Sequence, residues 1–342
     1  MMRGLRYFIL SCALSLLTSP AIAAKAPAKA KSASAQTAKA LDKAQLAFQR
    51  DLVSVLAPQA DAMPLLGAAL LARPLVNQPR SNSFHTLIKR AAYAEGTNAA
   101  VYWVRLADCD VAADTCPNPN ALEQLQTQAA DNAAVWLLKL GVDAHDMKRD
   151  ATRDDLRKAA AAKIYDDYTG SSLKALADAV GVLPPAAGTF DPVRKGGAVG
   201  MQAVLVFGIG SAQPQPGLPL IAKLCQNSAE DASIKSDCQK LGKLLEWGSS
   251  PLSRSLGLHL VEVLSDDPAQ QQAAREARRN LIWQVQNFGE LLARAQDDPV
   301  VAQHLLALAR HGGTEMSLQL AALRDNNIPT DAPVNWQPRH SE

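Results

Sequence analysis

The chain has 342 residues, with 35 basic and 33 acidic side chains and a formal net charge of +2 at pH 7. This near balance gives no support for nucleic-acid binding, which usually shows a basic excess. Five cysteines are present, four of them in two pairs that lie close in sequence.

Residues 1–23 have the three parts of a secretory signal peptide. Two arginines precede an apolar run (residues 7–17), and the small residues Ala21 and Ala23 stand at the −3 and −1 positions of a cleavage site. The run is shorter than the roughly 20 apolar residues that cross a bilayer. We therefore expect cleavage after Ala23 and a periplasmic or secreted mature chain without a transmembrane segment. Lipidation at Cys12 is the alternative, disfavoured because the apolar run continues past that residue.

Residues 24–40 follow the cleavage site and carry four lysines and no acidic residue. Their Ala, Lys, Ser and Pro composition cannot bury a core, so we expect a disordered linker. A contact of these lysines with anionic lipid or the cell wall is the alternative. The mature chain has 33 basic and 33 acidic residues, since both lost charges are arginines.

Apolar side chains recur at steps of three and four along most of residues 41–328, which predicts amphipathic helices. Examples are Phe84, Leu87, Ile88 and Ala91, and later Leu281, Val285, Phe288 and Leu292. The best strand candidate, residues 203–210, is a short apolar run that a buried helix explains better. Asp267 and Asp298 each precede a proline, the pattern of an N-cap with Pro at the first helical position. The sequence predicts an all-α fold.

A Pro/Gly-rich segment, residues 183–197, divides the predicted helices. We expect it to link an N-terminal helical half, residues 41–182, to a C-terminal half, residues 198–328. A polar tail, residues 329–342, carries Trp336, which we expect to fold back on the body or to engage a partner.

The most specific internal signal is a repeat: NAAVYWVRL begins at Asn98 and NAAVWLLKL begins 34 residues later, at Asn132. On these residues the chain resembles a tetratricopeptide-type helical hairpin, whose period is 34 residues. The positions that match the Trp, Leu and Gly of that family's first helix are Trp103, Leu106 and Ala107, then Leu137, Leu140 and Gly141. The resemblance covers about residues 97–155, and a cysteine-containing loop replaces the family's tight turn. It implies stacked helical hairpins with a protein-binding concave surface, and it implies no catalysis.

Four cysteines remain after cleavage, and an even number in an exported chain indicates disulfides. We pair Cys109 with Cys116 and Cys225 with Cys238, the neighbours in sequence. Neither pair has the shorter spacing of a zinc site or of a redox motif. Each bond would join two helices across their connection. The predicted architecture is therefore an irregular α-solenoid of stacked helical hairpins with two local disulfides.

The densest cluster of possible metal ligands is Asp143, His145 and Asp146, within residues 143–155. The EF-hand pattern is absent there, and interleaved basic residues favour a solvated charged connection. The phosphate-binding loop, the metalloprotease motif and the serine-hydrolase elbow are also absent. No catalytic or cofactor-binding residue is assigned, and no cofactor is expected.

These observations predict a non-enzymatic, exported helical-repeat protein of the cell envelope that binds a protein or peptide. The alternative is a secreted enzyme or metal-binding protein with its site in the groove between the helical halves. Perturbed titratable groups converging in one pocket would favour the enzyme. An apolar groove without them would favour binding.

Overall fold

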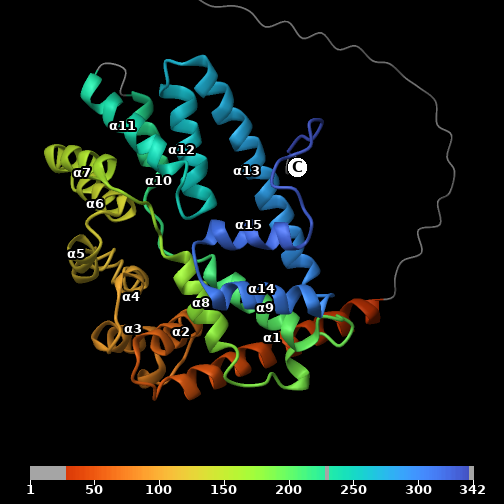
Figure 1. The fold of residues 1–342 in the computed structure, drawn as a ribbon. Coiled ribbons are helices and arrows are strands. Elements are labelled where there is room, and N and C mark those ends of the chain that lie inside the picture. Colours follow the sequence, from red (N-terminus) through yellow and green to blue (C-terminus); the bar gives the residue numbers. More distant parts are fainter. Residues whose placement is uncertain (1–27, 228–230, 339–342) are drawn as a thin grey trace, which may run out of the picture. The chain divides into compact units, whose positions relative to one another are not determined.

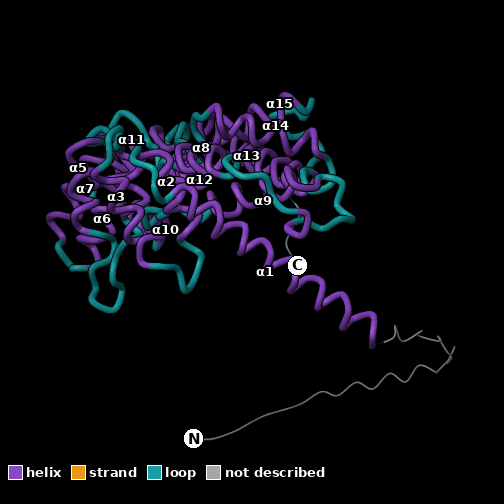
Figure 2. Tube along the Cα trace, turned by 90° about the horizontal axis from the view of Figure 1, so that it is seen from below, coloured by secondary structure: helices purple, strands orange, loops and turns teal. Residues whose placement is uncertain are grey.

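The computed structural model describes residues 28–227 and 231–338 (Figure 1). Within these ranges the chain forms fifteen α-helices, two short 3-10 helices and no strand, with one isolated bridge between Asn132 and Ile164. Figure 2 shows the same composition of helices and connecting loops. The predicted all-α fold is confirmed. The predicted signal peptide lies outside the described residues.

The first helix, α1, spans Ala28–Leu56. Residues 28–40, part of the segment predicted as a disordered linker, are included in this helix, and the linker stays a prediction. Alanine and lysine are strong helix formers, which explains why this segment can extend the helix that follows it. Later in α1, Phe48 and Leu52 are buried in the core.

The remaining helices divide the chain into short segments joined by short loops. They are α2 (Ala62–Ala72), α3 (Phe84–Tyr93), α4 (Ala99–Arg105), α5 (Pro119–Gln128), α6 (Ala133–His145), α7 (Arg149–Ala161), α8 (Thr169–Ala179), α9 (Gly197–Gly210), α10 (Leu218–Gln226), α11 (Ala232–Leu245), α12 (Pro251–Leu264), α13 (Pro268–Arg294), α14 (Pro299–His311) and α15 (Glu315–Asp325), with 3-10 helices at Arg80–Asn82 and Ala187–Thr189.

Two predicted helix starts are confirmed. The side chain of Asp267 accepts a hydrogen bond from the backbone N–H of Ala269, and that of Asp298 accepts one from Val300. Each aspartate satisfies a backbone donor that has no partner within the helix, and the following proline removes another.

The repeated segments at Asn98 and Asn132 also begin helices. The Asn98 side chain accepts a hydrogen bond from Ala100 N at 3.0 Å in α4, and the Asn132 side chain accepts one from Ala134 N at 3.1 Å in α6. Beyond this helix start the two segments differ, because α4 has 7 residues and leads into the loop that contains Cys109 and Cys116, whereas α6 has 13 residues. The repeat is thus a repeated helix start, which gives no evidence for a tetratricopeptide-type unit.

Neighbouring helices pair as expected for hairpins, notably α2 with α3, α6 with α7, and α11 with α12. However, α8 packs against α2, α9 and α14, helices that lie far apart in sequence (Figure 1). A linear solenoid contacts mainly its sequence neighbours, so these contacts do not confirm the predicted solenoid. Residues 41–342 form one unit, and the segment 183–197 connects α8 to α9 within it.

The segment 164–168 lies between α7 and α8 and is held by backbone hydrogen bonds. Ala133 N, at the start of α6, donates to Ile164 O at 2.8 Å. Ser249 N, just before α12, donates to Tyr165 O at 3.1 Å, and Met316 N of α15 donates to Ser249 O at 2.9 Å. The first turns of α6, α8, α12 and α15 therefore meet at one place, which we call the helix junction.

Both predicted disulfides are present. Cys109 and Cys116 are bonded within the loop between α4 and α5, with Cα atoms 4.9 Å apart. Cys225 of α10 and Cys238 of α11 are bonded with Cα atoms 5.6 Å apart, and both are fully buried. The two disulfides fit an oxidising compartment. Within the described residues, no helix is long and apolar enough to cross a membrane.

The C-terminal tail lies along α13. The indole rings of Trp336 and Trp283 meet edge to face with centroids 5.4 Å apart, and Arg279 donates to Ala332 O at 2.9 Å. Trp336 therefore folds back on the body of the protein.

Candidate functional site

A pocket of about 860 Å³ lies among four segments that are distant in sequence. We call it the cystine pocket. Its wall combines the end of α2, the cystine loop (residues 107–117), the last turns of α6 and the connection 212–217 that precedes α10. Ligand pockets span roughly 300–1,000 Å³ and are mostly apolar. The apolar part of the wall includes Leu106, Leu122, Leu138 and Val142.

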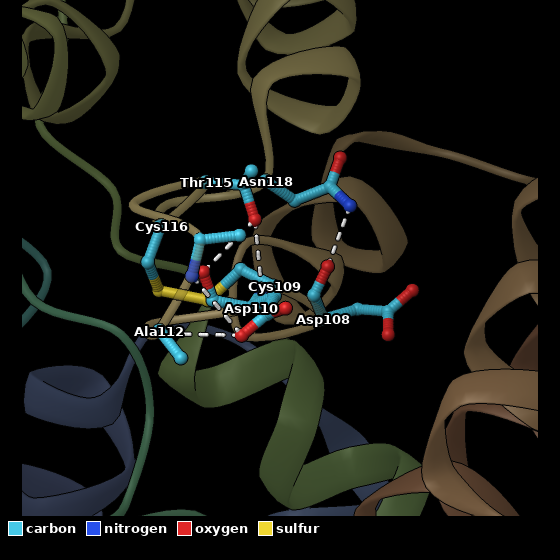
Figure 3. Close-up of a disulfide and its surroundings, with 8 residues drawn as sticks. Asp108, Cys109, Asp110, Ala112, Thr115, Cys116 and Asn118 are labelled. Carbon is cyan, nitrogen blue, oxygen red and sulfur yellow. Dashed lines mark hydrogen bonds between the residues drawn. A yellow bond between two sulfur atoms is a disulfide. The ribbon is translucent and has the colours of Figure 1, made fainter.

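The cystine loop is held in shape by its own hydrogen bonds (Figure 3). Asp110 Oδ1 accepts from Ala112 N at 3.0 Å, and Thr115 Oγ1 accepts from Asp110 N at 2.9 Å. The Asn118 side chain caps α5 and donates to Asp108 O at 2.6 Å. Together with the Cys109–Cys116 bond, these contacts fix the conformation of the cystine loop, which forms part of the pocket wall.

Another part of the wall is the connection 212–217, which is hydrogen-bonded to the buried core. Trp103, fully buried in α4, donates its indole N–H to Pro214 O at 3.1 Å. Gln213 is only 6% exposed and donates from Nε2 to Gly210 O at 3.3 Å. The buried Oε1 atoms of Gln213 and Gln215 have no hydrogen-bond partner among the described residues. This wall therefore contains two unpaired amide oxygens, which a rotation of the glutamine side chains would turn toward the pocket.

Arg73 is the half-buried cation of the pocket wall. It is the C-cap of α2, where its backbone N–H donates to Ala69 O. Its guanidinium makes no ion pair or hydrogen bond with any described residue, and its Nη2 atom is buried without a partner. Burial lowers the pKa of Arg73 from its usual value.

The three candidate ligands of the sequence analysis lie near one another, with Lys148 between the two carboxylates. Lys148 Nζ is 3.6 Å from Asp143 Oδ1 and 2.7 Å from Asp146 Oδ2, and His145 Nδ1 is 3.5 Å from Asp146 Oδ1. Asp143 is 2% exposed and pairs with Lys139 on the side of α6 that faces α7. His145 and Asp146 line the cystine pocket instead, with Asp146 Oδ2 at 2.7 Å from Lys148 Nζ. That hydrogen bond lowers the pKa of Asp146. Among the described residues, no three His, Cys, Asp or Glu side chains form a possible metal site.

A second acidic residue, Asp155 of α7, lies beside Asp143 and was not selected from the sequence. Asp155 Oδ2 is 4.0 Å from Lys139 Nζ, and the residue is 3% exposed. Burial, with the charge of Asp143 adding to it and that of Lys139 opposing it, raises the pKa of Asp155 to about 6. Because both carboxylates are buried between α6 and α7, a substrate could not reach them.

The helix junction holds another acidic group. Asp166 Oδ1 accepts from Tyr168 N at 2.9 Å, and Asp167 Oδ1 accepts from Thr169 N at 3.2 Å and from Ser249 Oγ at 3.3 Å. Burial, and then the charge of Asp167, raises the pKa of Glu315 to about 7. Asp166 and Asp167 accept backbone N–H groups at the start of α8, where carboxylates are favoured by the helix dipole. None of the three carboxyl groups lines the cystine pocket.

No protein-family model, curated protein or solved structure matches the chain. Function is therefore argued from the geometry of the pocket alone.

Proposed function

We propose that the protein is an exported binding protein of the cell envelope that holds a peptide, or a peptide segment of another protein, in the cystine pocket. The observation that carries this proposal is a pocket of about 860 Å³ with apolar side chains between two walls fixed by a disulfide and by the Trp103–Pro214 hydrogen bond. Preformed pockets of this kind bind ligands without a large ordering cost.

The distribution of titratable groups favours binding over catalysis. An enzyme of general acid–base type needs groups with matched pKa values that converge on the substrate. Of the carboxyl groups with raised pKa values, Asp155 belongs to the α6–α7 interface, and Asp166 and Glu315 belong to the helix junction. Export remains part of the proposal and is supported by the two disulfides and by the pattern of residues 1–23.

A glycine in the pocket wall provides a direct test. A Cβ atom placed on Gly141 of α6 would have no heavy atom within 4 Å, so a larger side chain there enters open space. We expect Gly141→Phe to fill part of the pocket and to lower the retention of peptides about tenfold or more. The assay would pass a random peptide pool over the immobilised chain 24–342 and identify retained peptides by mass spectrometry.

Gly289→Phe is the matched control. Gly289 is an exposed helical glycine of α13 that also has open space at its Cβ and lies outside the pocket. Both substitutions replace glycine within a helix, where phenylalanine is better tolerated. Failure of the wild-type chain to retain any peptide, or equal retention by the Gly141→Phe variant, would contradict the proposed function.

A further inference from the structure

The guanidinium of Arg73 is a candidate anion-binding group, because it has no ion pair or hydrogen bond among the described residues. A half-buried guanidinium without a counter-ion loses part of its hydration and gains no ion pair, which is an unfavourable arrangement in a folded protein. Arg254 donates to Gly248 O at 2.9 Å. Arg105 is more buried and its Nε atom also lacks a hydrogen-bond partner, but its guanidinium lies 5.8 Å from the Tyr93 ring centroid and does not line the cystine pocket. The unpaired guanidinium of Arg73 stands instead in the wall of the cystine pocket.

The rest of the wall limits which anion can bind. Arg73 is the one arginine of the lining and no lysine lines it, whereas Asp114 and Asp146 both contribute to it. Asp146 is already paired with Lys148. A single guanidinium matches a carboxylate, which it can grip with two parallel hydrogen bonds. A phosphate dianion would keep one charge uncompensated near two acidic residues.

The neighbouring acceptors indicate what the anion is attached to. Gln213 and Gln215 each have an amide oxygen without a partner, and these oxygens can accept backbone N–H groups. Apolar side chains form the space between. A carboxylate, backbone donors and apolar side chains occur together in the C-terminal residues of a peptide.

We infer that the cystine pocket binds a peptide through a carboxylate, with Arg73 as the charge partner and the apolar wall receiving the adjoining side chains. This inference rests on the proposed function and adds the chemical class of the ligand. The carboxylate comes either from the free C-terminus of a peptide or from a glutamate side chain, and the assay below separates the two sources.

The test uses three pools of N-acetylated tripeptides of the same size. The first ends in a free carboxylate and contains no Asp or Glu, the second has the same sequences as C-terminal amides, and the third has C-terminal amides with one Glu. We expect the immobilised chain 24–342 to retain the free acids about 10- to 100-fold better than the amides, as for hydrogen bonds to a charged group. Better retention of the third pool would assign the carboxylate to a side chain.

Two substitutions connect the preference to Arg73. In Arg73→Gln the preference for acids over amides should disappear while the amides are retained as by the wild type. In Arg80→Gln, which removes a surface arginine outside this pocket, the preference should persist. An acid preference that survives Arg73→Gln would overturn the role of Arg73.

The inference and the proposed function fail in different ways. If the wild-type chain retains all three pools equally and Gly141→Phe abolishes that retention, the carboxylate inference is wrong and the peptide-binding function stands. If the chain retains none of the pools, the proposed function is wrong, and the inference falls with it.

Discussion

Charged side chains are partly or fully withdrawn from water at both the helix junction and the cystine pocket, but only those at the junction have hydrogen-bond partners. At the junction, Asp166 and Asp167 accept hydrogen bonds from backbone N–H groups in the first turn of α8, and Asp167 also accepts one from Ser249. At the pocket, the guanidinium of Arg73 has no partner among the described residues.

The two regions also differ in packing. At the junction, a Cβ atom on Gly170 would lie 1.9 Å from Gly313 O, because two backbones approach each other there. In the pocket wall, the corresponding space at Gly141 is open. The junction thus has the features of a structural connection, whereas the pocket wall combines open space with an unpaired guanidinium.

The largest effect is expected at Gly170. Gly170→Ala must separate the backbones of α8 and the α14–α15 loop, so we expect it to lower the free energy of unfolding by about 3 kcal/mol or more. Gly141→Ala should instead raise it by up to about 1 kcal/mol, since alanine is favoured over glycine within a helix. Urea unfolding followed by circular dichroism measures both. Equal changes in unfolding free energy at the two glycines would contradict the difference in packing between the helix junction and the pocket wall.

The carboxylate of Asp167 should be the next most sensitive group. Asp167→Ala leaves the donors of Thr169 and Ser249 buried without their acceptor, so we expect a loss of about 2–3 kcal/mol in unfolding free energy. Asp167→Asn retains one acceptor oxygen and should lose less. Chemical denaturation at pH 7 compares the two variants, and an alanine variant as stable as the asparagine one would contradict this role.

The pH dependence of stability tests the charge at the junction. Glu315 has a folded-state pKa of about 7, above its ordinary value of 4.5, so its folded form binds a proton more tightly than the unfolded form. This contribution is complete below pH 4.5 and is lost as the pH rises through 7. We expect the unfolding free energy to fall by about 1–3 kcal/mol between pH 5 and pH 8.

Asp155 and Asp166, whose pKa values are also raised by burial, contribute in the same direction. Glu315→Gln should flatten the profile by the share of Glu315. A profile that rises from pH 5 to pH 8, or one unchanged in the glutamine variant, would show that Glu315 is not responsible.

The smallest effect, with the opposite sign, is expected at Arg73. Arg73→Met keeps most of the apolar stem and removes an unpaired buried charge, so stability should be unchanged or should increase by up to about 1 kcal/mol. Thermal or urea unfolding measures it. A loss of more than about 1 kcal/mol in unfolding free energy would mean that Arg73 stabilises the fold. Arg73 would then have a structural role, as the acidic residues of the helix junction do.

The local predictions succeeded where the determining contacts lie within a few residues. The N-caps at Asp267 and Asp298 depend on an aspartate followed directly by proline, and both are confirmed. The disulfides close segments with separations of only 7 and 13 residues, so pairing neighbours in sequence was correct. The repeat at Asn98 and Asn132 marked two helix starts, although it did not predict how the helices stack.

The candidate site could be found only in part. His145 and Asp146 were selected from the sequence and do line the cystine pocket, whereas Asp143, on the same helix, points to α7. Residues two positions apart on a helix point in different directions, so the sequence cluster is divided between the pocket wall and the α6–α7 interface, with Lys148 pairing with both Asp143 and Asp146. Nothing in the sequence around Arg73 marked it, because its lack of a partner is a property of the assembled wall.

The sequence by itself determined the helical fold, the helix starts and the two cystines, because each depends on hydrogen bonds or loop closures within short stretches of chain. Only the tertiary structure decided that α8 contacts helices from both ends of the chain, that four helix starts meet around Asp167, and that four distant segments enclose a pocket beside Arg73. These features arise from long-range packing, in which the partner of a side chain is chosen by shape and burial across the whole fold.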